Sequence, residues 1–306
     1  MNKIKKHVII SSCVAVSTIT IAALLCFNLN LGIDSRNRNW MKDINESTSL
    51  AEISLPGSHD SLALYSLVDV AGKCQDASIT QQLNFGVRFF DVRLQLRNNV
   101  LRAVHGIVDE KMTFDTFNNE VDDFLKANPS ETVIVSIKKE GDDVKSTSTF
   151  EESIKPKLSS YYTESRIPTL KEVRGKKVLL NRYTSKEKIG LEACAGWNDN
   201  STFIIDNSTY KINVQDHYKF DDAEIKLNDI SSFINSTLLY KDATNLSLNY
   251  FSGYLSKGFP PSYSVPVAKV VNPQAKKIIE NNYFVGTCIF DFVTYDLATS
   301  VIRRNF

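Results

Sequence analysis

Two histidines and an arginine stand where short apolar runs of the chain end, and together they could move protons around a phosphate. His59 and His105 carry imidazoles, whose ordinary pKa of about 6.5 suits a general base or a general acid near neutral pH. Arg93 supplies a permanent, forked cation for the non-bridging oxygens of a phosphate. Carboxylates beside the histidines would orient the rings and stabilise the imidazolium.

Polar residues follow nearly every predicted strand, so the three residues above belong to a larger pattern. Asp91 and Arg93 lie on one face of their strand because alternate residues point to the same side. The other groups are His59-Asp60, His105-Gly106, Lys138 to Glu140, Asn181-Arg182, Asp216 to Tyr218, Asn249 and Asp291. In a barrel of parallel strands, these positions would converge on the carboxyl-end face, where such enzymes keep their active sites.

Each of these residues also has an ordinary structural interpretation. A histidine in a turn is more often structural than catalytic, and Asp60 could bond to its own backbone. Asp91 and Arg93 could form a simple ion pair, and Lys138 could belong to a solvated loop. The recurrence of polar groups at successive strand ends favours one shared site over separate coincidences.

The elements that must position these residues are short apolar runs alternating with helical patterns. Strands are predicted over 51–55, 87–94, 101–104, 132–137, 177–180, 211–214, 246–249 and 286–290. Helices are predicted over 114–126, 222–239, 273–281 and 297–304. Eight strands interleaved with helices favour an α/β fold, a single-domain TIM-type β/α barrel, over a doubly wound sheet. The barrel should be irregular, because Arg93 leads almost directly into the next strand.

The first 33 residues differ from the rest and predict a targeting segment. Lys3, Lys5 and Lys6 precede an uncharged run over 8–33. As a helix this run would reach roughly 39 Å, enough to span a bilayer. Two interpretations stay open: a cleaved signal peptide, which makes 34–306 a secreted domain, and an uncleaved signal-anchor that holds the same domain outside the membrane.

Composition excludes several classes of protein. With 42% hydrophobic and 23% charged residues, the chain is ordinary globular material rather than a disordered segment. Its 36 Lys+Arg balance 35 Asp+Glu, which argues against a nucleic-acid partner. Without the three N-terminal lysines the formal net charge changes from +1 to −2. No nucleotide-phosphate loop motif and no Cys/His metal spacing is present, and we expect a monomer.

Several motifs together resemble a known family. The runs 53–61, 86–93 and His105-Gly106 are similar to the X domain of bacterial phosphatidylinositol-specific phospholipase C. The resemblance continues in order through 128–132, 136–140, 173–176, 179–183, 214–218 and 289–291. It covers the chain from about residue 39 to the C-terminus and implies an irregular TIM-type barrel.

The resemblance also implies a reaction and a set of catalytic residues. His59 would be the general base that takes the proton from the inositol 2-hydroxyl, and Asp291 would orient it. Arg93 would stabilise the phosphate charge in the transition state. His105 would protonate the leaving diacylglycerol oxygen with help from Asp60. The products would be diacylglycerol and inositol 1,2-cyclic phosphate, which a slower second step would open.

For the inositol headgroup, the resemblance implies a pocket. Lys138, Arg182 and Asp216 would bind ring hydroxyls with Glu140 nearby, and Tyr218 would stack under the ring. Relatives that use calcium hold the ion where this chain has Arg93, so the resemblance implies an enzyme that needs neither a metal nor a cofactor.

The sequence allows two alternative functions and predicts one binding partner. A glycerophosphodiesterase-like or other phosphodiesterase barrel would need clustered carboxylates as metal ligands. A catalytically silent X domain would only bind inositol lipids, and such domains usually lose a histidine. The partner is a phosphatidylinositol-containing membrane surface. The apolar stretches 62–70 and 254–265, with Phe259 and Tyr263, are the predicted lipid contacts.

Overall fold

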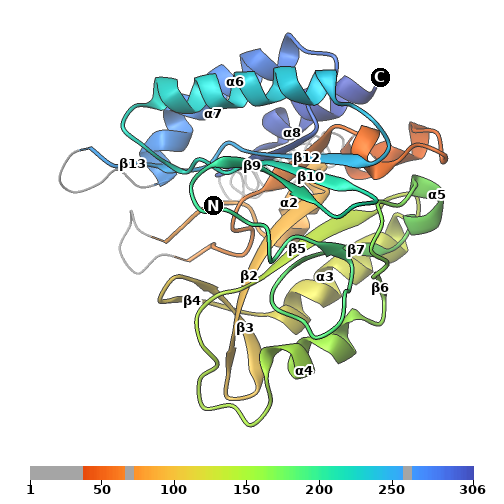
Figure 1. Cartoon of the computed structure of the whole chain (residues 1–306), viewed down its shortest axis with the longest axis vertical. Helices are drawn as coiled ribbons and strands as arrows, with labels where there is room; N and C mark the ends of the chain where they lie inside the picture. Colours follow the sequence, from red (N-terminus) through yellow and green to blue (C-terminus); the bar gives the residue numbers. More distant parts are fainter. Residues whose placement is uncertain (1–36, 66–71, 258–263) are drawn as a thin grey trace, which may run out of the picture.

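A curled, mostly parallel β-sheet with helices packed against its outer face forms the centre of the molecule (Figure 1). The computed structural model describes residues 37–65, 72–257 and 264–306. The strand order is β6 (Tyr161–Tyr162), β7 (Lys177–Arg182), β5 (Val133–Lys139), β2 (Phe89–Arg97), β1 (Leu55–Ser58), β14 (Thr287–Phe290), β12 (Asn245–Tyr250), β10 (Lys211–Gln215) and β9 (Thr202–Asp206). Neighbours pair in parallel throughout, except that β9 runs antiparallel to β10.

The barrel is distorted because side chains, rather than a strand ladder, connect the two ends of this sheet within the described ranges. The short strand β8 (Leu191–Glu192) pairs with β7 at one end. The backbone N–H of Glu192 donates to the Tyr210 hydroxyl at 2.8 Å, and Asn207 Nδ2 donates to the Glu192 carbonyl at 3.0 Å. The predicted irregular TIM-type barrel is therefore confirmed.

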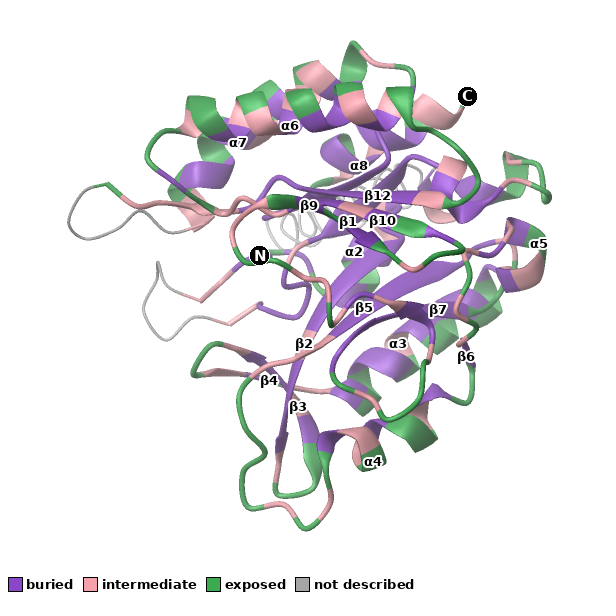
Figure 2. Ribbon diagram, viewed as in Figure 1, coloured by how far each residue is buried: buried purple, intermediate pink, exposed green. Residues whose placement is uncertain are grey.

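Alternate residues along the strands separate two apolar cores, and Figure 2 shows the central strands β2, β5, β7 and β12 as mostly buried. One core lies between the sheet and the helices and takes residues such as Phe90 and Val135. The other lies inside the curl and takes Phe89, Ile134, Leu180, Leu248 and Ile289. Two positions further along the same strands, the inward residues become polar: Asp91, Ser136, Arg182, Tyr250 and Asp291. The apolar floor of the barrel thus ends in a polar layer at the carboxyl ends of the strands.

The helices are α2 (Ile79–Phe85), α3 (Phe114–Ala127), α4 (Phe150–Ile154), α5 (Leu170–Val173), α6 (Ala223–Leu239), α7 (Ser264–Glu280) and α8 (Tyr295–Ile302). Side-chain caps set the starts of three long ones, with Thr113 before α3, Asp222 before α6 and Thr294 before α8. The predictions over 114–126, 222–239 and 297–304 are confirmed to within two residues at each end. The prediction over 273–281 found only the second half of α7, because Pro273 lies inside this helix rather than at its start.

Two of the eight predicted barrel strands do not form barrel strands over the predicted residues. Of residues 51–55, Ala51 and Glu52 belong to a 3₁₀ turn, Leu50–Glu52, and only Leu55 is part of a strand, β1. Ser49 caps this turn, and Glu52 bonds back to the Ser49 N–H. Residues 101–104 belong to β3 (Val100–His105), which pairs antiparallel with β2 and with β4 (Val108–Thr113). Asn98 and Asn99 have φ of 50° and 61°. A two-residue turn of that kind joins antiparallel strands, here β2 and β3. A second hairpin, β3 with β4, follows it beside the barrel.

Some predicted features lie outside the described residues. They are the N-terminal segment 1–33, residues 66–70 of the first apolar stretch, and residues 258–263 of the second, which include Phe259 and Tyr263. Within the described ranges, no helix combines the length and apolar character that crossing a bilayer requires.

Candidate active site

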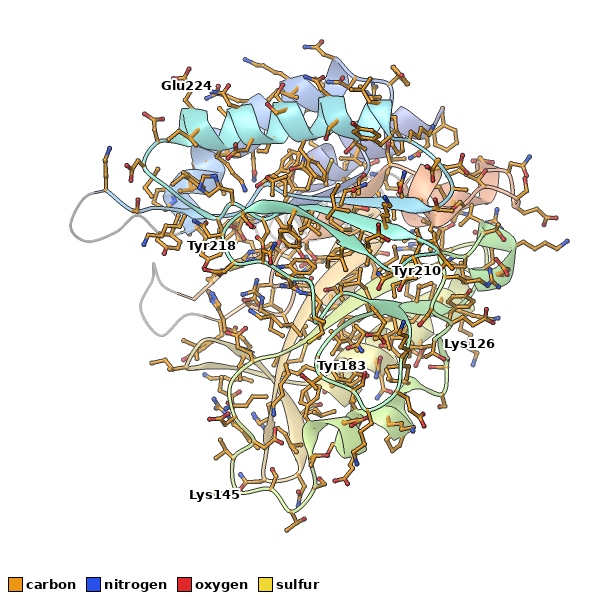
Figure 3. All side chains as sticks on the ribbon, viewed as in Figure 1. Lys126, Lys145, Tyr183, Tyr210, Tyr218 and Glu224 are labelled. Carbon is orange, nitrogen blue, oxygen red and sulfur yellow. The ribbon has the colours of Figure 1, made fainter. Side chains whose placement is uncertain are left out.

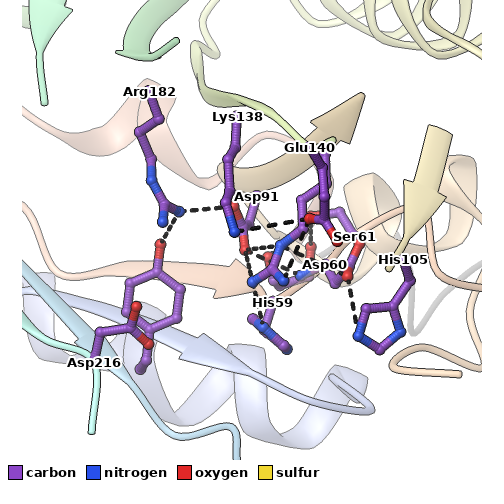
Figure 4. A network of polar contacts seen from close by, with 12 residues as sticks. His59, Asp60, Ser61, Asp91, His105, Lys138, Glu140, Arg182 and Asp216 are labelled. Atoms are coloured by element: carbon purple, nitrogen blue, oxygen red, sulfur yellow. Dashed lines mark hydrogen bonds and ion pairs between the residues drawn. The ribbon is translucent and has the colours of Figure 1, made fainter. Parts of the chain in front are cut away.

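The carboxyl ends of the barrel strands surround a pocket of about 1000 Å³, and most of the predicted site residues line it. These are His59, Arg93, His105, Lys138, Arg182, Asp216, Tyr218 and Asp291. Asp60 and Glu140 lie directly behind this lining and contact its members (Figure 4). The structure therefore brings every predicted site residue to one end of the barrel.

His59 follows β1 and is fixed through both ring nitrogens. Its Nδ1 lies 2.8 Å from Asp291 Oδ1, and a carboxylate only accepts, so Nδ1 carries the proton. Its Nε2 is then an acceptor and receives a bond from Arg93 Nη2 at 2.8 Å. Burial lowers the pKa of His59, but the Asp291 carboxylate opposes it, and the net shift is upward. A neutral imidazole with a raised pKa and an inward-facing lone pair is equipped to act as a base.

The guanidinium of Arg93 lies at the centre of the charged groups. Asp91 Oδ2 accepts from its Nε at 3.3 Å and its Nη2 at 3.1 Å, and Asp60 Oδ2 lies 3.6 Å from its Nε. Burial would raise the pKa of Asp91, but the guanidinium groups of Arg93 and Arg182 hold it far below its usual value. Asp91 is therefore a carboxylate that fixes two arginines.

His105 ends β3 in the hairpin and differs from His59 in its partners. Its Nδ1 donates to the carbonyl of Gly72 at 2.7 Å, which leaves Nε2 3.7 Å from Asp60 Oδ2. Burial raises the pKa of Asp60 despite the nearby Arg93. Asp60 has a φ of 38°, a left-handed conformation that aspartate tolerates better than most residues. The turn after β1 thus places the base His59 and the carboxylate beside His105 at adjacent positions.

Glu140 connects the hairpin to the end of β5. Its Oε1 accepts from the N–H of Gly106, next to His105, at 2.6 Å. Its Oε2 lies 3.7 Å from Lys138 Nζ and 3.8 Å from Arg93 Nη1. Burial would raise the pKa of Glu140, but Arg93 and Lys138 lower it. Glu140 is therefore positioned to hold His105 against the barrel as well as to contact the pocket.

The far side of the pocket uses residues that the sequence did not reveal. The Arg182 guanidinium stacks 3.4 Å above the Trp197 ring, and Trp197 Nε1 donates to Asp216 Oδ2 at 3.1 Å. Arg182 Nη1 also reaches Asp91 Oδ1 at 3.2 Å and Tyr250 Oη at 3.3 Å. Trp197 lies in a loop with no neighbouring strand pattern, so its one signal was a large aromatic residue in a polar stretch.

Tyr218 follows β10 at the pocket rim. Figure 3 shows Tyr210, which precedes β10, and Tyr218 at opposite ends of this strand. The Tyr218 hydroxyl donates to Asp199 Oδ1 at 2.8 Å, and its ring centre lies 6.0 Å from that of Tyr254. An aromatic face that is held at the pocket edge suits stacking against the apolar face of a sugar-like ring.

Known proteins are similar to this chain in sequence and fold. Residues 54–183 match the family model described as phosphatidylinositol-specific phospholipase C, X domain. The chain is 32% identical over 295 residues to a 1-phosphatidylinositol phosphodiesterase of Staphylococcus aureus (strain Newman), which covers 87% of this chain and 94% of the relative. It is 26% identical over 285 residues to a protein of the same name from Listeria monocytogenes, which covers 88% and 85%.

Solved structures agree with these relatives. A variant of the phosphatidylinositol-specific phospholipase C from Staphylococcus aureus matches with a TM-score of 0.82 at 31% identity, over 90% of this chain and 98% of that one. The enzyme of the same description from Listeria monocytogenes has a TM-score of 0.73 at 24% identity, over 88% and 99%, and supports the fold alone. The near-complete coverage of a relative above 30% identity shows that this chain belongs to the phosphatidylinositol-specific phospholipase C family.

Proposed function

We propose that the protein cleaves phosphatidylinositol to diacylglycerol and inositol 1,2-cyclic phosphate. One observation carries the proposal: each of the two histidines has its Nδ1 bound, and Arg93 lies beside the Nε2 of His59 and close to Asp60, the partner of His105. This arrangement can remove one proton and deliver another across a phosphate. The names of the relatives agree with a phosphatidylinositol substrate.

In the first step the nucleophile belongs to the substrate. His59 Nε2 takes the proton of the inositol 2-hydroxyl, and the 2-oxygen forms a bond to phosphorus. The bond from phosphorus to the diacylglycerol oxygen breaks, and protonated His105 gives its Nε2 proton to that oxygen. Arg93 exchanges its bond with His59 for bonds to the phosphate oxygens, where it stabilises the charge of the transition state.

The second step reverses the two histidines. Neutral His105 takes a proton from water, and the water oxygen attacks the phosphorus of the cyclic phosphate. The bond to the 2-oxygen breaks, and His59 returns the proton that it took in the first step. Asp291 stabilises His59 while it holds that proton.

Residues on the side of the pocket opposite the two histidines select the headgroup. Lys138, Arg182 and Asp216 offer two donors and one acceptor for ring hydroxyls, and Tyr218 offers an aromatic face. Burial and the neighbouring cation Arg93 lower the pKa of Lys138. Oxygen atoms of a bound ligand would compensate the charge that these cations place in the pocket.

Phosphorus NMR separates this function from its alternatives. The full chain is incubated with phosphatidylinositol in mixed detergent micelles, and the expected first product is inositol 1,2-cyclic phosphate. His59→Ala should abolish it. A linear phosphate as the first product would instead indicate a glycerophosphodiesterase-like reaction. Binding of inositol lipid without any product would indicate a silent domain.

We also propose that the reaction needs no metal, because the Arg93 guanidinium already supplies a cation 2.8 Å from the base His59. The rate should be unchanged, or higher, when a chelator is added. Loss of activity in chelator with recovery in calcium would overturn this point.

Residues 1–33 are proposed to export the domain, so that it works outside the cell at a phosphatidylinositol-containing membrane. Sequencing the N-terminus of the exported protein distinguishes a cleaved signal from an anchor. A start beyond residue 33 indicates cleavage. An intact start that fractionates with membranes indicates an anchor.

A further inference from the structure

Cys74 is a buried thiol between the two halves of the site, and the proposed reaction does not use it. Its side chain is 1% exposed and borders the pocket. Its backbone is held on both sides, because its N–H donates to the Ala63 carbonyl at 2.9 Å and its own carbonyl accepts from Phe292 at 2.7 Å. The thiol is therefore a fixed feature of the pocket wall.

Two sets of metal-binding side chains meet at this sulfur. In the first set, ligand atoms of Cys74, His59 and Asp291 lie within 4.8 Å of one another. In the second set, ligand atoms of Cys74, Asp60 and His105 do the same. A Cys, His and carboxylate combination is typical of sites for zinc and similar divalent cations.

The second set is the one with available atoms. In the first, His59 Nδ1 and Asp291 Oδ1 already bond to each other at 2.8 Å, and a metal would have to break that bond. In the second, Asp60 Oδ2 is buried and accepts no hydrogen bond from the described residues. His105 Nδ1 is occupied by the Gly72 carbonyl, which turns Nε2 toward Oδ2 at 3.7 Å.

We propose that Cys74, Asp60 and His105 bind a thiophilic divalent cation such as Zn²⁺, and that this cation inhibits the enzyme. Ligand atoms around tetrahedral zinc lie roughly 3–4 Å apart, so the three atoms need only small side-chain movements. The Cys74 thiol forms a sulfur–metal bond and releases its proton to solvent. Water completes the coordination.

The metal inhibits the enzyme because it coordinates His105 Nε2. His105 Nε2 must carry a proton to the leaving oxygen, and it cannot do so while bound to a cation. This consequence rests on the proposed function, whereas the binding itself does not.

Nearby charges set the affinity and the choice of ion. Arg93, 3.6 Å from Asp60 Oδ2, repels a cation, but the carboxylates of Asp91, 3.1 Å from Arg93, and Asp291, close to Cys74, partly offset this repulsion. The single thiolate favours Zn²⁺ or Co²⁺ over Ca²⁺ and Mg²⁺, which require several oxygen ligands.

Cobalt provides a probe that does not depend on turnover. The full chain is titrated with Co²⁺, and the thiolate–cobalt charge-transfer band in the near ultraviolet is followed. Cys194 is a matched control, because it also borders the pocket but belongs to neither ligand set. The band should appear in the wild type and in Cys194→Ser and be absent in Cys74→Ser. Zn²⁺ should displace it.

Inhibition is then measured against the zinc-free rate of each variant. The Zn²⁺ concentration for half-inhibition should rise at least about tenfold in Cys74→Ser and stay unchanged in Cys194→Ser. If Cys74→Ser does not fold, His105→Ala is titrated with Co²⁺ in its place. Weaker Co²⁺ binding by this variant than by the wild type supports the site. A cobalt band that persists in Cys74→Ser, or no band in the wild type, would overturn the proposal even if the protein cleaves phosphatidylinositol.

Discussion

His59 and His105 have different partners at Nδ1, and this difference supports different roles. His59 bonds to the charged carboxylate of Asp291, which stabilises the ring once it takes a proton. His105 bonds to the neutral carbonyl of Gly72, and its carboxylate partner Asp60 lies on the Nε2 side. A base gains from a partner that favours its charged form, whereas an acid must give its proton up.

Asp291→Asn tests the role of this carboxylate. The amide oxygen can still accept from His59 Nδ1, so the ring stays in place but loses the charge that raises its pKa. We expect kcat to fall by a factor on the order of 10²–10⁴. The acidic limb of the kcat/KM profile should move to lower pH, because a base with a lower pKa stays unprotonated further into acid. An unmoved limb would contradict the assignment of His59 as the base, and Asp296→Asn on the surface of α8 is the control.

Glu110 makes a prediction about stability. It lies on β4, is 5% exposed, and accepts from the Tyr65 N–H at 2.8 Å. Burial raises its pKa from 4.5 to about 7, so the folded state holds the proton more tightly than the unfolded chain does. Its contribution to stability is therefore present below about pH 4.5 and is lost as the pH rises toward 7.

Glu110→Gln keeps an acceptor for Tyr65 and removes the ionisation. The variant should gain on the order of 1–3 kcal/mol of unfolding free energy over the wild type near pH 8, and much less near pH 4.5. Chemical denaturation at both values measures this. The exposed Glu46 supplies the control Glu46→Gln, which should show no such change. An equal difference at both pH values would count against the raised pKa.

At the scale of elements, local patterns predicted strand ends but not every pairing. The alternation along β2 correctly placed Asp91 and Arg93 on one face, and the arrangement of β5, β7, β12 and β14 followed from their apolar runs. The position of β3 outside the barrel did not follow from its sequence, because a hairpin strand and a barrel strand bury similar residues. The loop that carries Trp197 could not be placed either, since its stacking on Arg182 depends on distant parts of the chain.

A buried ion pair joins the elements below the site. Arg88 and Glu131 are both 0% exposed, and Arg88 Nε and Nη2 reach Glu131 Oε2 at 3.0 and 2.9 Å. Arg88 also donates to the carbonyl of Leu83 in α2 and to that of Arg38, which precedes the 3₁₀ turn Trp40–Asp43. One guanidinium thus connects α2, the start of β2 and the segment that leads into the barrel.

Arg88→Met should destabilise the fold by about 3–5 kcal/mol, because Glu131 is left charged and buried without a partner. The double variant Arg88→Met/Glu131→Leu should lose less, since no buried charge remains. Urea unfolding measures both. If the double variant is the less stable of the two, then the carbonyl contacts of Arg88 matter more than its ion pair.

The whole molecule presents its pocket at one end of the barrel, and lipid has to enter there. Ile107, in the hairpin turn directly after His105 and Gly106, is 94% exposed beside this pocket. Leu239 is 80% exposed at the end of α6, close to the start of β12. β12 starts near Leu239 and runs toward the site, which lies at its carboxyl end. Ile107 and Leu239 therefore lie at opposite ends of the molecule.

This placement predicts a difference between substrates rather than a general loss of activity. Burying an isoleucine side chain in a lipid surface contributes up to about 1.5–3 kcal/mol, so Ile107→Asn should weaken vesicle binding by about tenfold or more. Cleavage of phosphatidylinositol in vesicles should fall accordingly, while turnover of soluble inositol 1,2-cyclic phosphate should hardly change, because that substrate reaches the pocket from water. Leu239→Asn should leave both rates as they are. Equal losses on both substrates for Ile107→Asn would show that the side chain supports the hairpin and His105 instead of meeting the membrane.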